Sequence, residues 1–347
     1  MAEPRSAPKV RLKDVADAVG VSVGAVGRVL NGTGIGSISV SPDTEKRIKE
    51  AAARLGYRVN YAARQLRGGR SGIIGLITHK GTSEEGLRRI IDLELAASDA
   101  DLDVMVAVLE ADSMVSKLEK AQVARAFDRF SLRGVDGVIS MSWQLRNVTS
   151  EMTRGLPLAH VGPAELLKDL PGVHLDATEG GRITARHLLE RGRKRVGFAL
   201  ARHAFARARI QGAREVLREV GKSIDPKCVI FDRTHAYGTH EMAEAVVDHL
   251  VDDQQVDAIV AENDHWAIRI LNELRRREFK IPEQVAVIGY NNLPFCEYSS
   301  PTITSIDERE EEIAFAAVNV IQGLIEGRKE ARKARRMSPL LVERDST

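Results

Sequence analysis

The residues best suited to chemistry lie near the start of the chain. Ser22 follows Gly20 and opens an apolar helical pattern that contains Arg28. A serine at a helix start accepts hydrogen bonds from unpaired backbone amides, and a glycine such as Gly20 suits a left-handed helix exit. An arginine on the second helix can donate paired hydrogen bonds to guanine O6 and N7. This spacing predicts a helix-turn-helix whose second helix lies in the DNA major groove.

The distribution of charge supports a polyanionic partner. Residues 1–70 hold 13 Lys and Arg against six Asp and Glu, a net charge of +7, whereas the remaining residues carry −5. Phosphate contacts dominate nucleic-acid affinity, so a basic head on a mildly acidic body suits DNA binding. A solvated charged tail is the alternative, which the helical pattern disfavours.

Three short helices are expected to position these residues. The seam between the first two can be formed by Val15, Ala16, Val19, Val21, Val26 and Leu30. A third helix is expected to begin at Ser41-Pro42-Asp43, residues that suit a cap, a first turn and the helix dipole. It carries an apolar stripe of Ile48, Ala51, Ala52 and Leu55 and ends at Gly56. The glycines of residues 68–72 predict a flexible joint.

Beyond residue 72, short apolar strands alternate with helices. Strands are expected near 73–77, 104–108, 137–140, 158–161, 173–175, 195–199, 228–230, 258–260 and 285–288, and helices near 84–99, 113–130, 179–191, 206–220, 238–251 and 264–277. The alternation predicts parallel sheets in doubly wound α/β domains, with enough strands for two sheets. Ligands bind at the carboxyl ends of such strands, and a cleft between two sheets is a natural site.

Other protein classes find little support. Cys228 and Cys296 are too few for a disulfide scaffold and lack metal-ligand spacing. The run His240-Glu241-Met242-Ala243-Glu244 lacks the second histidine of a zinc protease helix. Neither an export signal nor a membrane-spanning run is evident. We therefore expect a cytoplasmic, nucleoid-associated protein that is not an enzyme and needs no cofactor, metal or membrane.

From about Val10 to Thr347 the chain resembles the lactose-repressor (LacI/GalR) family of bacterial transcription regulators. The similar stretches occur in order and include Lys13-Asp14-Val15-Ala16, Arg28-Val29-Leu30-Asn31-Gly32, Leu55-Gly56-Tyr57-Arg58-Val59-Asn60, Asn263-Asp264, Ile281-Pro282-Glu283-Gln284-Val285-Ala286 and Pro301-Thr302-Ile303-Thr304-Ser305-Ile306. The resemblance implies a homodimer that binds a pseudo-palindromic double-stranded DNA operator. It also implies a small-molecule effector that acts through a periplasmic-binding-protein-like core. A solute-binding transport protein would share that core but would lack the basic head.

The resemblance also implies the domain boundaries. Residues 1–59 would form the helix-turn-helix head, 60–71 a hinge helix and linker, and 72–347 the core. Within the core, the N-lobe would hold about 72–172 and 303–333, and the C-lobe about 173–302 and 334–347. The expected function is repression of carbohydrate or sugar-acid metabolism genes, and the sequence leaves open whether the effector releases DNA or promotes binding.

By position, the implied DNA contacts are Ser22, Val23, Gly24, Gly27, Arg28, Asn31, Tyr57, Asn60, Ala63 and Leu66. Two glycines inside one short helix cost about 1 kcal/mol each in helix propensity. Close approach of the backbone to DNA would explain them, and relaxed constraint is the alternative. Leu66 would wedge into the minor groove and kink the duplex, or else pack its helix against the dimer mate.

The implied effector contacts are Trp143, His203, Phe205, Arg209, Arg233, Asn263 and Asn291. Asn291 stands where many relatives have an Asp that binds sugar hydroxyls. Several cations, Arg202, Arg207, Arg209, Arg233 and His235, crowd loops expected at the cleft. A lost acid and several cations favour an anionic ligand such as a sugar acid, a uronate or a phosphorylated sugar. Arg202 and Arg207 are equally compatible with solvated helix charges. Trp143 or Phe205 could stack on a ring, although Trp143 also suits a partly buried structural role.

Overall fold

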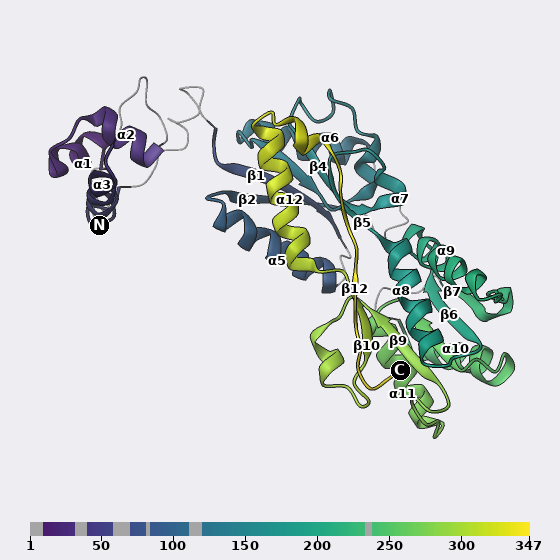
Figure 1. Ribbon diagram of the computed structural model, residues 1–347. Helices are drawn as coiled ribbons and strands as arrows, with labels where there is room; N and C mark the ends of the chain where they lie inside the picture. The colour runs from purple at the N-terminus through teal and green to yellow at the C-terminus, as the bar shows by residue number, and fades with distance from the viewer. Residues whose placement is uncertain (1–9, 32–39, 58–69, 81–83, 111–119, 233–237) are drawn as a thin grey trace, which may run out of the picture. The chain divides into compact units, whose positions relative to one another are not determined.

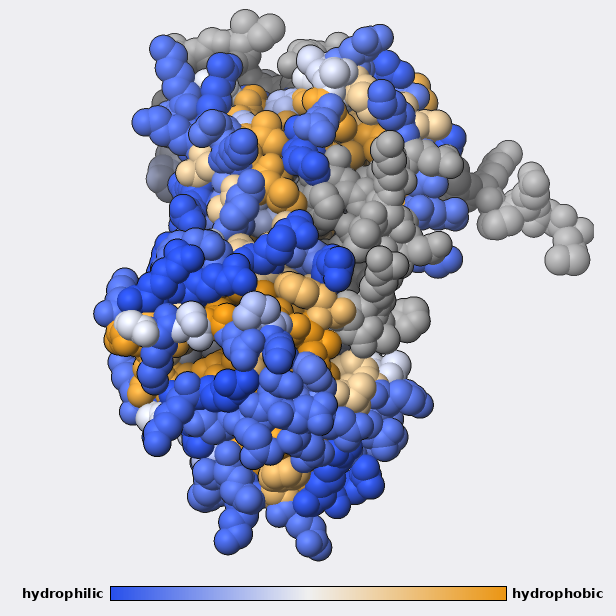
Figure 2. All heavy atoms as spheres, turned by 90° about the vertical axis from the view of Figure 1, so that its right-hand side faces the viewer, coloured by the Kyte–Doolittle hydropathy of each residue, from blue (hydrophilic) through white to orange (hydrophobic). Residues whose placement is uncertain are grey.

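The computed structural model describes residues 10–31, 40–57, 70–80, 84–110, 120–232 and 238–347 (Figure 1). The chain divides into two compact units, a head up to Gly72 and a larger core from Ile73. No helix in these ranges is both long and apolar enough to cross a membrane. Hydrophilic side chains cover most of the core face shown in Figure 2.

The head is built from three helices, α1 (Leu12–Val19), α2 (Val23–Asn31) and α3 (Pro42–Leu55). Gly20 ends α1 with a φ of 75°, and Ser41 caps α3 by accepting a hydrogen bond from the Thr44 amide. The predicted seam between α1 and α2 is confirmed, with Val15, Ala16, Val19 and Val26 buried and Val21 and Leu30 partly buried against them. The predicted apolar stripe of α3 is confirmed for Ile48, Ala51 and Ala52, which are buried in the same cluster. The prediction was wrong for Leu55, which is 36% exposed.

The first sheet of the core is parallel, with the strand order β11-β5-β4-β3-β1-β2. Its strands are β1 (Ile73–His79), β2 (Asp103–Leu109), β3 (Gly137–Ser140), β4 (Leu158–Pro163), β5 (Gly172–Leu175) and β11 (Arg335–Met337). One face packs against α5 (Glu84–Asp99) and α12 (Glu310–Ile325), the other against α6 (Lys120–Leu132). Shorter elements are α7 (Ala164–Leu167) and the 3₁₀ turns Trp143–Asn147 and Lys329–Arg332.

The second sheet has the order β12-β10-β9-β8-β6-β7, and only β12 is antiparallel to its neighbour among these described strands. Its strands are β6 (Val196–Ala201), β7 (Val229–Asp232), β8 (Ala258–Ala261), β9 (Ala286–Tyr290), β10 (Thr304–Asp307) and β12 (Leu340–Val342). Helices α8 (Ala177–Glu190) and α9 (Ala204–Glu219) cover one face. The other is covered by α10 (His240–Val246), which continues as a π-helix (Val247–Asp253), and by α11 (Asp264–Arg276). The turns Pro226–Cys228 and Pro294–Glu297 are 3₁₀.

The chain crosses between the two sheets at three places. These crossings follow β5, follow β10 and separate β11 from β12. The expected lobe boundaries therefore need correction. Because β5 and β11 pair within the first sheet, residues 173–175 and 335–337 belong to the N-lobe, and because β10 pairs with β9, residues 304–307 belong to the C-lobe.

Candidate functional site

The second helix of the head presents a short exposed face. Ser22, Val23, Gly24 and Arg28 are exposed, with Val23 at 45%. Ser22 Oγ accepts a hydrogen bond from the Ala25 amide at 3.1 Å, which fixes the start of α2. Gly24 lies one turn before Arg28, so the arginine stands beside bare backbone on the same side of the helix. This face can approach a duplex closely while Arg28 reaches a base edge.

Two residues predicted to contact DNA do not lie on the exposed face of α2. Gly27 is buried together with Ala25 and Val26, so it does not belong to the exposed face of α2. Tyr57 is partly buried and packs against the apolar core of the head. Asn31 ends α2, but its side chain lies outside the described residues, as do Asn60, Ala63 and Leu66 altogether.

In the core, the carboxyl ends of β6, β8, β9 and β10 bring several predicted effector residues together. Arg209, in the second turn of α9, is 6% exposed and donates from Nη1 to the Glu262 carbonyl oxygen at 2.6 Å. Its guanidinium lies over the Tyr290 ring, with Cζ 3.5 Å from the centroid, a cation–π contact. Across the described chain, the Arg209 Nε donor is buried without a hydrogen-bond partner.

Glu262, which sequence reasoning missed, is the counter-ion of Arg209. Its carboxylate lies 3.5 Å from Arg209 Nη1 and accepts a hydrogen bond from the Ala201 amide at 3.0 Å. His203 accepts from the Ala206 amide through Nδ1, so its Nε2 carries the proton and donates to Glu262 at 2.8 Å. Burial tends to raise the pKa of Glu262, but His203 and Arg209 lower it below its ordinary value. Glu262 is therefore ionised at neutral pH and balances the charge of Arg209.

The two predicted asparagines are buried at neighbouring strand ends. Asn263 Oδ1 caps α11 by accepting from the Trp266 amide at 3.0 Å. Asn291 has a φ of 97°, and its backbone N–H donates a hydrogen bond to the Ile306 carbonyl oxygen at 2.7 Å. Asp264 ties the same region together because it accepts from Ser305 Oγ at 2.6 Å and from the Leu293 amide at 2.7 Å. Burial raises the pKa of Asp264 to about 7.

Helix α5 of the first lobe contacts the second lobe and the crossing after β10. Glu84 lies 3.0 Å from His265, and Arg88 donates to the Asn292 carbonyl at 3.5 Å. Arg89 binds both carboxylate oxygens of Glu310 at 2.5 Å and Glu308 at 3.2 Å. These contacts hold the two lobes together.

The aromatic predictions are resolved only in part. Phe205, in α9 of the second lobe, packs against the apolar cluster of the first lobe and lies edge-on to His203 at 5.9 Å. Trp143 begins the 3₁₀ turn after β3, and its side chain lies outside the described residues. Of these two aromatic residues, Phe205 is thus the one whose contact with the first lobe is described.

Of the cations expected at the cleft, Arg202, Arg207 and Arg209 lie in the described part of the chain. Arg202 and Arg207 are exposed, and Arg202 lies 5.7 Å from the Phe231 ring centroid. Arg233 and His235 fall outside the described residues. Among the described arginines in this prediction only Arg209 is buried, and it is already paired with Glu262.

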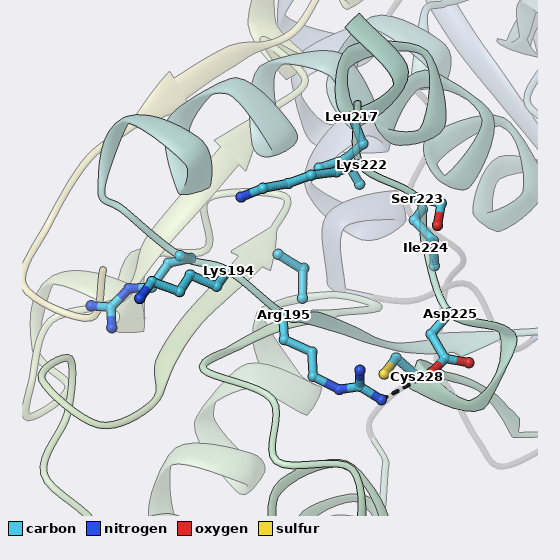
Figure 3. Close-up of a pocket in the computed structure, with 10 residues that line it drawn as sticks. Lys194, Arg195, Leu217, Lys222, Ser223, Ile224, Asp225 and Cys228 are labelled. Carbon is cyan, nitrogen blue, oxygen red and sulfur yellow. Dashed lines mark hydrogen bonds and ion pairs between the residues drawn. The ribbon is translucent and has the colours of Figure 1, made fainter. Parts of the chain in front are cut away.

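Two hollows accompany the site. A small one lies where the three crossings meet and is lined by Leu175, Asp176, Tyr290, Glu308, Met337 and Pro339. A wider one lies at the opposite edge of the second sheet, at the amino ends of β6 and β7 (Figure 3). There Arg195 is ion-paired with Asp225 at 2.9 Å, and Lys222 reaches across the hollow. This second hollow does not include the cleft residues.

One group in the described ranges has the composition of a metal site. The ligand atoms of His240, Glu244 and Glu273 lie within 4.8 Å of one another. However, Arg276 and Arg277 bind Glu273 at 2.5–2.7 Å and lower its pKa to about 2. Two guanidinium groups therefore supply the positive charge that a metal ion would bring.

Comparison with known proteins agrees with this division into head and core. Residues 11–60 match the model of bacterial regulatory proteins of the lacI family, and residues 185–347 match a periplasmic binding protein-like domain. The HTH-type transcriptional regulator RegA of Clostridium saccharobutylicum is 26% identical over 97% of this chain and 98% of its own. Catabolite control protein A of Priestia megaterium is 26% identical over 90% of this chain and 91% of its own.

Solved structures show the same fold. The lac repressor dimer bound to operator and the anti-inducer ONPF aligns with a TM-score of 0.75 at 20% identity, over 98% of this chain and 99% of that one. The regulator CelR in complex with cellobiose aligns with a TM-score of 0.66 at 24% identity, over 98% of this chain and 100% of that one. The sequence relatives are transcription regulators rather than enzymes. With a matching head, a matching core and relatives aligned over nearly their whole length, the chain belongs to the lacI family of DNA-binding transcription regulators.

Proposed function

We propose that this protein is a repressor that binds a pseudo-palindromic operator as a homodimer and is controlled by a carbohydrate or sugar-derived effector in the core cleft. The observation that carries the proposal is the exposed face of α2, with Arg28 beside Gly24, on a head of net charge +7. The buried polar residues around Arg209, at the ends of parallel strands, support the effector site. The lac repressor is recorded as a dimer on its operator, and CelR with cellobiose.

An apolar surface on the first lobe supports the dimer. Leu87, Ile91 and Leu95 recur every fourth residue along α5 and are 51–60% exposed. Beside them, Val106 and Val108 are exposed on β2, the edge strand of the first sheet (Figure 1). We call these five residues the dimer surface. Contiguous exposed apolar residues of this kind are typical of protein interfaces.

Replacing Ile91 with glutamate is expected to dissociate the dimer. Burying an unpaired carboxylate in an apolar interface costs several kcal/mol, so the dimer dissociation constant should rise by about 100-fold or more. Sedimentation equilibrium measures it. Leu132→Glu is the control, because Leu132 is 87% exposed on α6, outside the dimer surface. A dimeric Ile91→Glu protein would exclude this surface as the interface.

The proposed operator binding is tested by selecting duplexes from a random pool and then titrating the selected duplex with protein at several salt concentrations. We expect a pseudo-palindrome to be enriched and its affinity to fall steeply with salt. Arg28→Ala should then cost about 1–3 kcal/mol per half-site and relax the preference at one base pair.

The control for that variant is Arg54→Ala, which removes an exposed cation from α3 instead of α2. This variant should bind the selected and the scrambled duplexes more weakly by the same factor, without a change in base preference. If Arg28→Ala behaves in the same way, Arg28 does not read a base. If the pool yields no preferred site, the proposed repressor function is wrong.

A further inference from the structure

The wider hollow of the second lobe lies at the other end of the strands from the candidate effector residues (Figure 3). Its walls come from the loop 193–195 that leads into β6, from the last turn of α9 with the segment 222–225, and from the turn before β7. Its volume is about 140 Å³. A cavity of about 150 Å³ can hold a molecule the size of benzene, so a phosphate group fits in this space.

Cations outnumber acids in the lining of this hollow. Its charged side chains are those of Arg193, Lys194, Arg195, Lys222 and Asp225. Asp225 pairs with Arg195 at 2.9 Å, and a backbone hydrogen bond together with this arginine lowers the pKa of Asp225 below its ordinary value. Asp225 therefore stays ionised and offsets the charge of Arg195. The other three cations of the lining have no carboxylate in the lining to offset them.

A further acid, Asp257, lies behind the loop and binds its main chain. Its Oδ2 accepts a hydrogen bond from the Lys194 N–H at 2.7 Å, and its Oδ1 accepts one from the Arg195 N–H at 2.9 Å. Both carboxylate oxygens thus fix the backbone of the loop. Even when the charge of Asp257 is set against the three remaining cations, the hollow keeps a net positive charge.

Several hydrogen-bond donors at the hollow have no acceptor. Arg193 donates from Nη1 to the Glu283 carbonyl oxygen at 3.4 Å, but its Nε is buried without a partner in the described chain. The side chains of Lys194, Lys222 and Ser223 are exposed and make no hydrogen bond or ion pair with any described residue. Lys222 extends across the hollow (Figure 3). Guanidinium, ammonium and hydroxyl donors around one space match the acceptor oxygens of phosphate.

We propose that the wider hollow is a second ligand site, which binds a phosphate group separately from the effector cleft. The ligand is inorganic phosphate or a small phosphate monoester. A phosphate dianion can accept from several of these donors at once and offsets their charge, whereas a chloride ion brings a single charge. A phosphate bound there links the loop 193–195 to the segment 222–225 and stabilises the second lobe in proportion to its concentration. The site depends neither on the proposed effector nor on the proposed operator.

Calorimetric titration of the full-length protein with inorganic phosphate tests the proposal, with sodium chloride added to keep the ionic strength constant. Lys222→Gln should raise the dissociation constant for phosphate about fivefold to tenfold, because one charge-assisted hydrogen bond is lost. Lys329→Gln removes an exposed lysine of the first lobe and is the matched control, which should bind phosphate like the unmodified protein. Because Lys222 is exposed, its variant should keep the unfolding temperature of the unmodified protein in buffer without phosphate.

Glycerol 3-phosphate, titrated in parallel, distinguishes the two sources of the phosphate group. Affinity equal to that of inorganic phosphate assigns the site to monoesters, and much weaker binding assigns it to the free ion; both results support the site. The proposal is wrong if phosphate produces neither binding heat nor a rise in unfolding temperature. It is also wrong if the two lysine variants weaken phosphate binding equally. If Lys222→Gln lowers operator affinity but leaves phosphate binding intact, the hollow contacts DNA and the proposal is overturned.

Discussion

Arg89→Met is expected to destabilise the core by about 3–5 kcal/mol, because it leaves buried carboxylates without their cation. Glu310 would lose both hydrogen bonds from Arg89, and Glu308 would lose its nearest positive charge. The loss should shrink as the pH falls from 8 toward 5, because burial raises the pKa of Glu308 to about 7 and its protonation removes part of the uncompensated charge. Urea unfolding at several pH values measures the effect.

Arg88→Met is the matched control on the same helix. Among the described residues, Arg88 makes one hydrogen bond, a long one of 3.5 Å to the Asn292 carbonyl. We expect a loss of less than about 1 kcal/mol there, as is usual for a single weak polar contact. Equal losses for the two variants would show that the Arg89 pairs do not stabilise the core.

Gly181→Ala is expected to damage both the second lobe and the effector site. A Cβ at Gly181 would lie 1.9 Å from the Arg209 carbonyl oxygen, and one at Gly212 would lie 1.9 Å from the Thr178 carbonyl oxygen. Helices α8 and α9 thus pack through two glycines, and backbone atoms cannot give way as a side chain does. Overpacking of this kind costs about 1–3 kcal/mol and occasionally more. Because α9 must shift at Arg209 itself, effector affinity should fall too.

Gly197→Ala separates this effect from ordinary crowding. A Cβ at Gly197 would meet Leu250 Cδ1 at 3.0 Å, the flexible end of a side chain. We expect a smaller loss of stability and an unchanged effector affinity. If the Gly181→Ala protein has the stability and the effector affinity of the unmodified protein, the close packing of α8 on α9 does not position Arg209.

Most of the architecture could be predicted because its signals are local. The three helices of the head and the first nine strands of the core lie where apolar spacing and capping residues indicate. The elements that were missed depend on distant parts of the chain. Strand β11 has only three residues, and it begins with Arg335 and Arg336. Helix α12 is buried on several sides, so it lacks a clear polar face.

The candidate effector site was predicted less completely. The side-chain partners of its residues come from distant segments of the chain that are brought together only when the sheet forms. Arg209 was identified, but Glu262 was not, although it directly follows a predicted strand and precedes Asn263. Glu308 follows β10, a strand that local pattern did not reveal. The anionic effector was inferred from a group of arginines, of which Arg209 is paired with Glu262, a carboxylate from another element. Likewise, the burial of Gly27 follows from the packing of α2 within the head.

The central claim, that ligand in the core governs DNA binding by the head, is tested most directly by operator affinity with and without the hexose that binds best in calorimetry. The account predicts a change of about 5–150-fold in either direction at saturation, with the reciprocal change in hexose affinity on operator DNA. Arg209→Met should abolish the change while leaving operator affinity without sugar intact. An operator affinity that stays the same at saturating hexose would contradict the account.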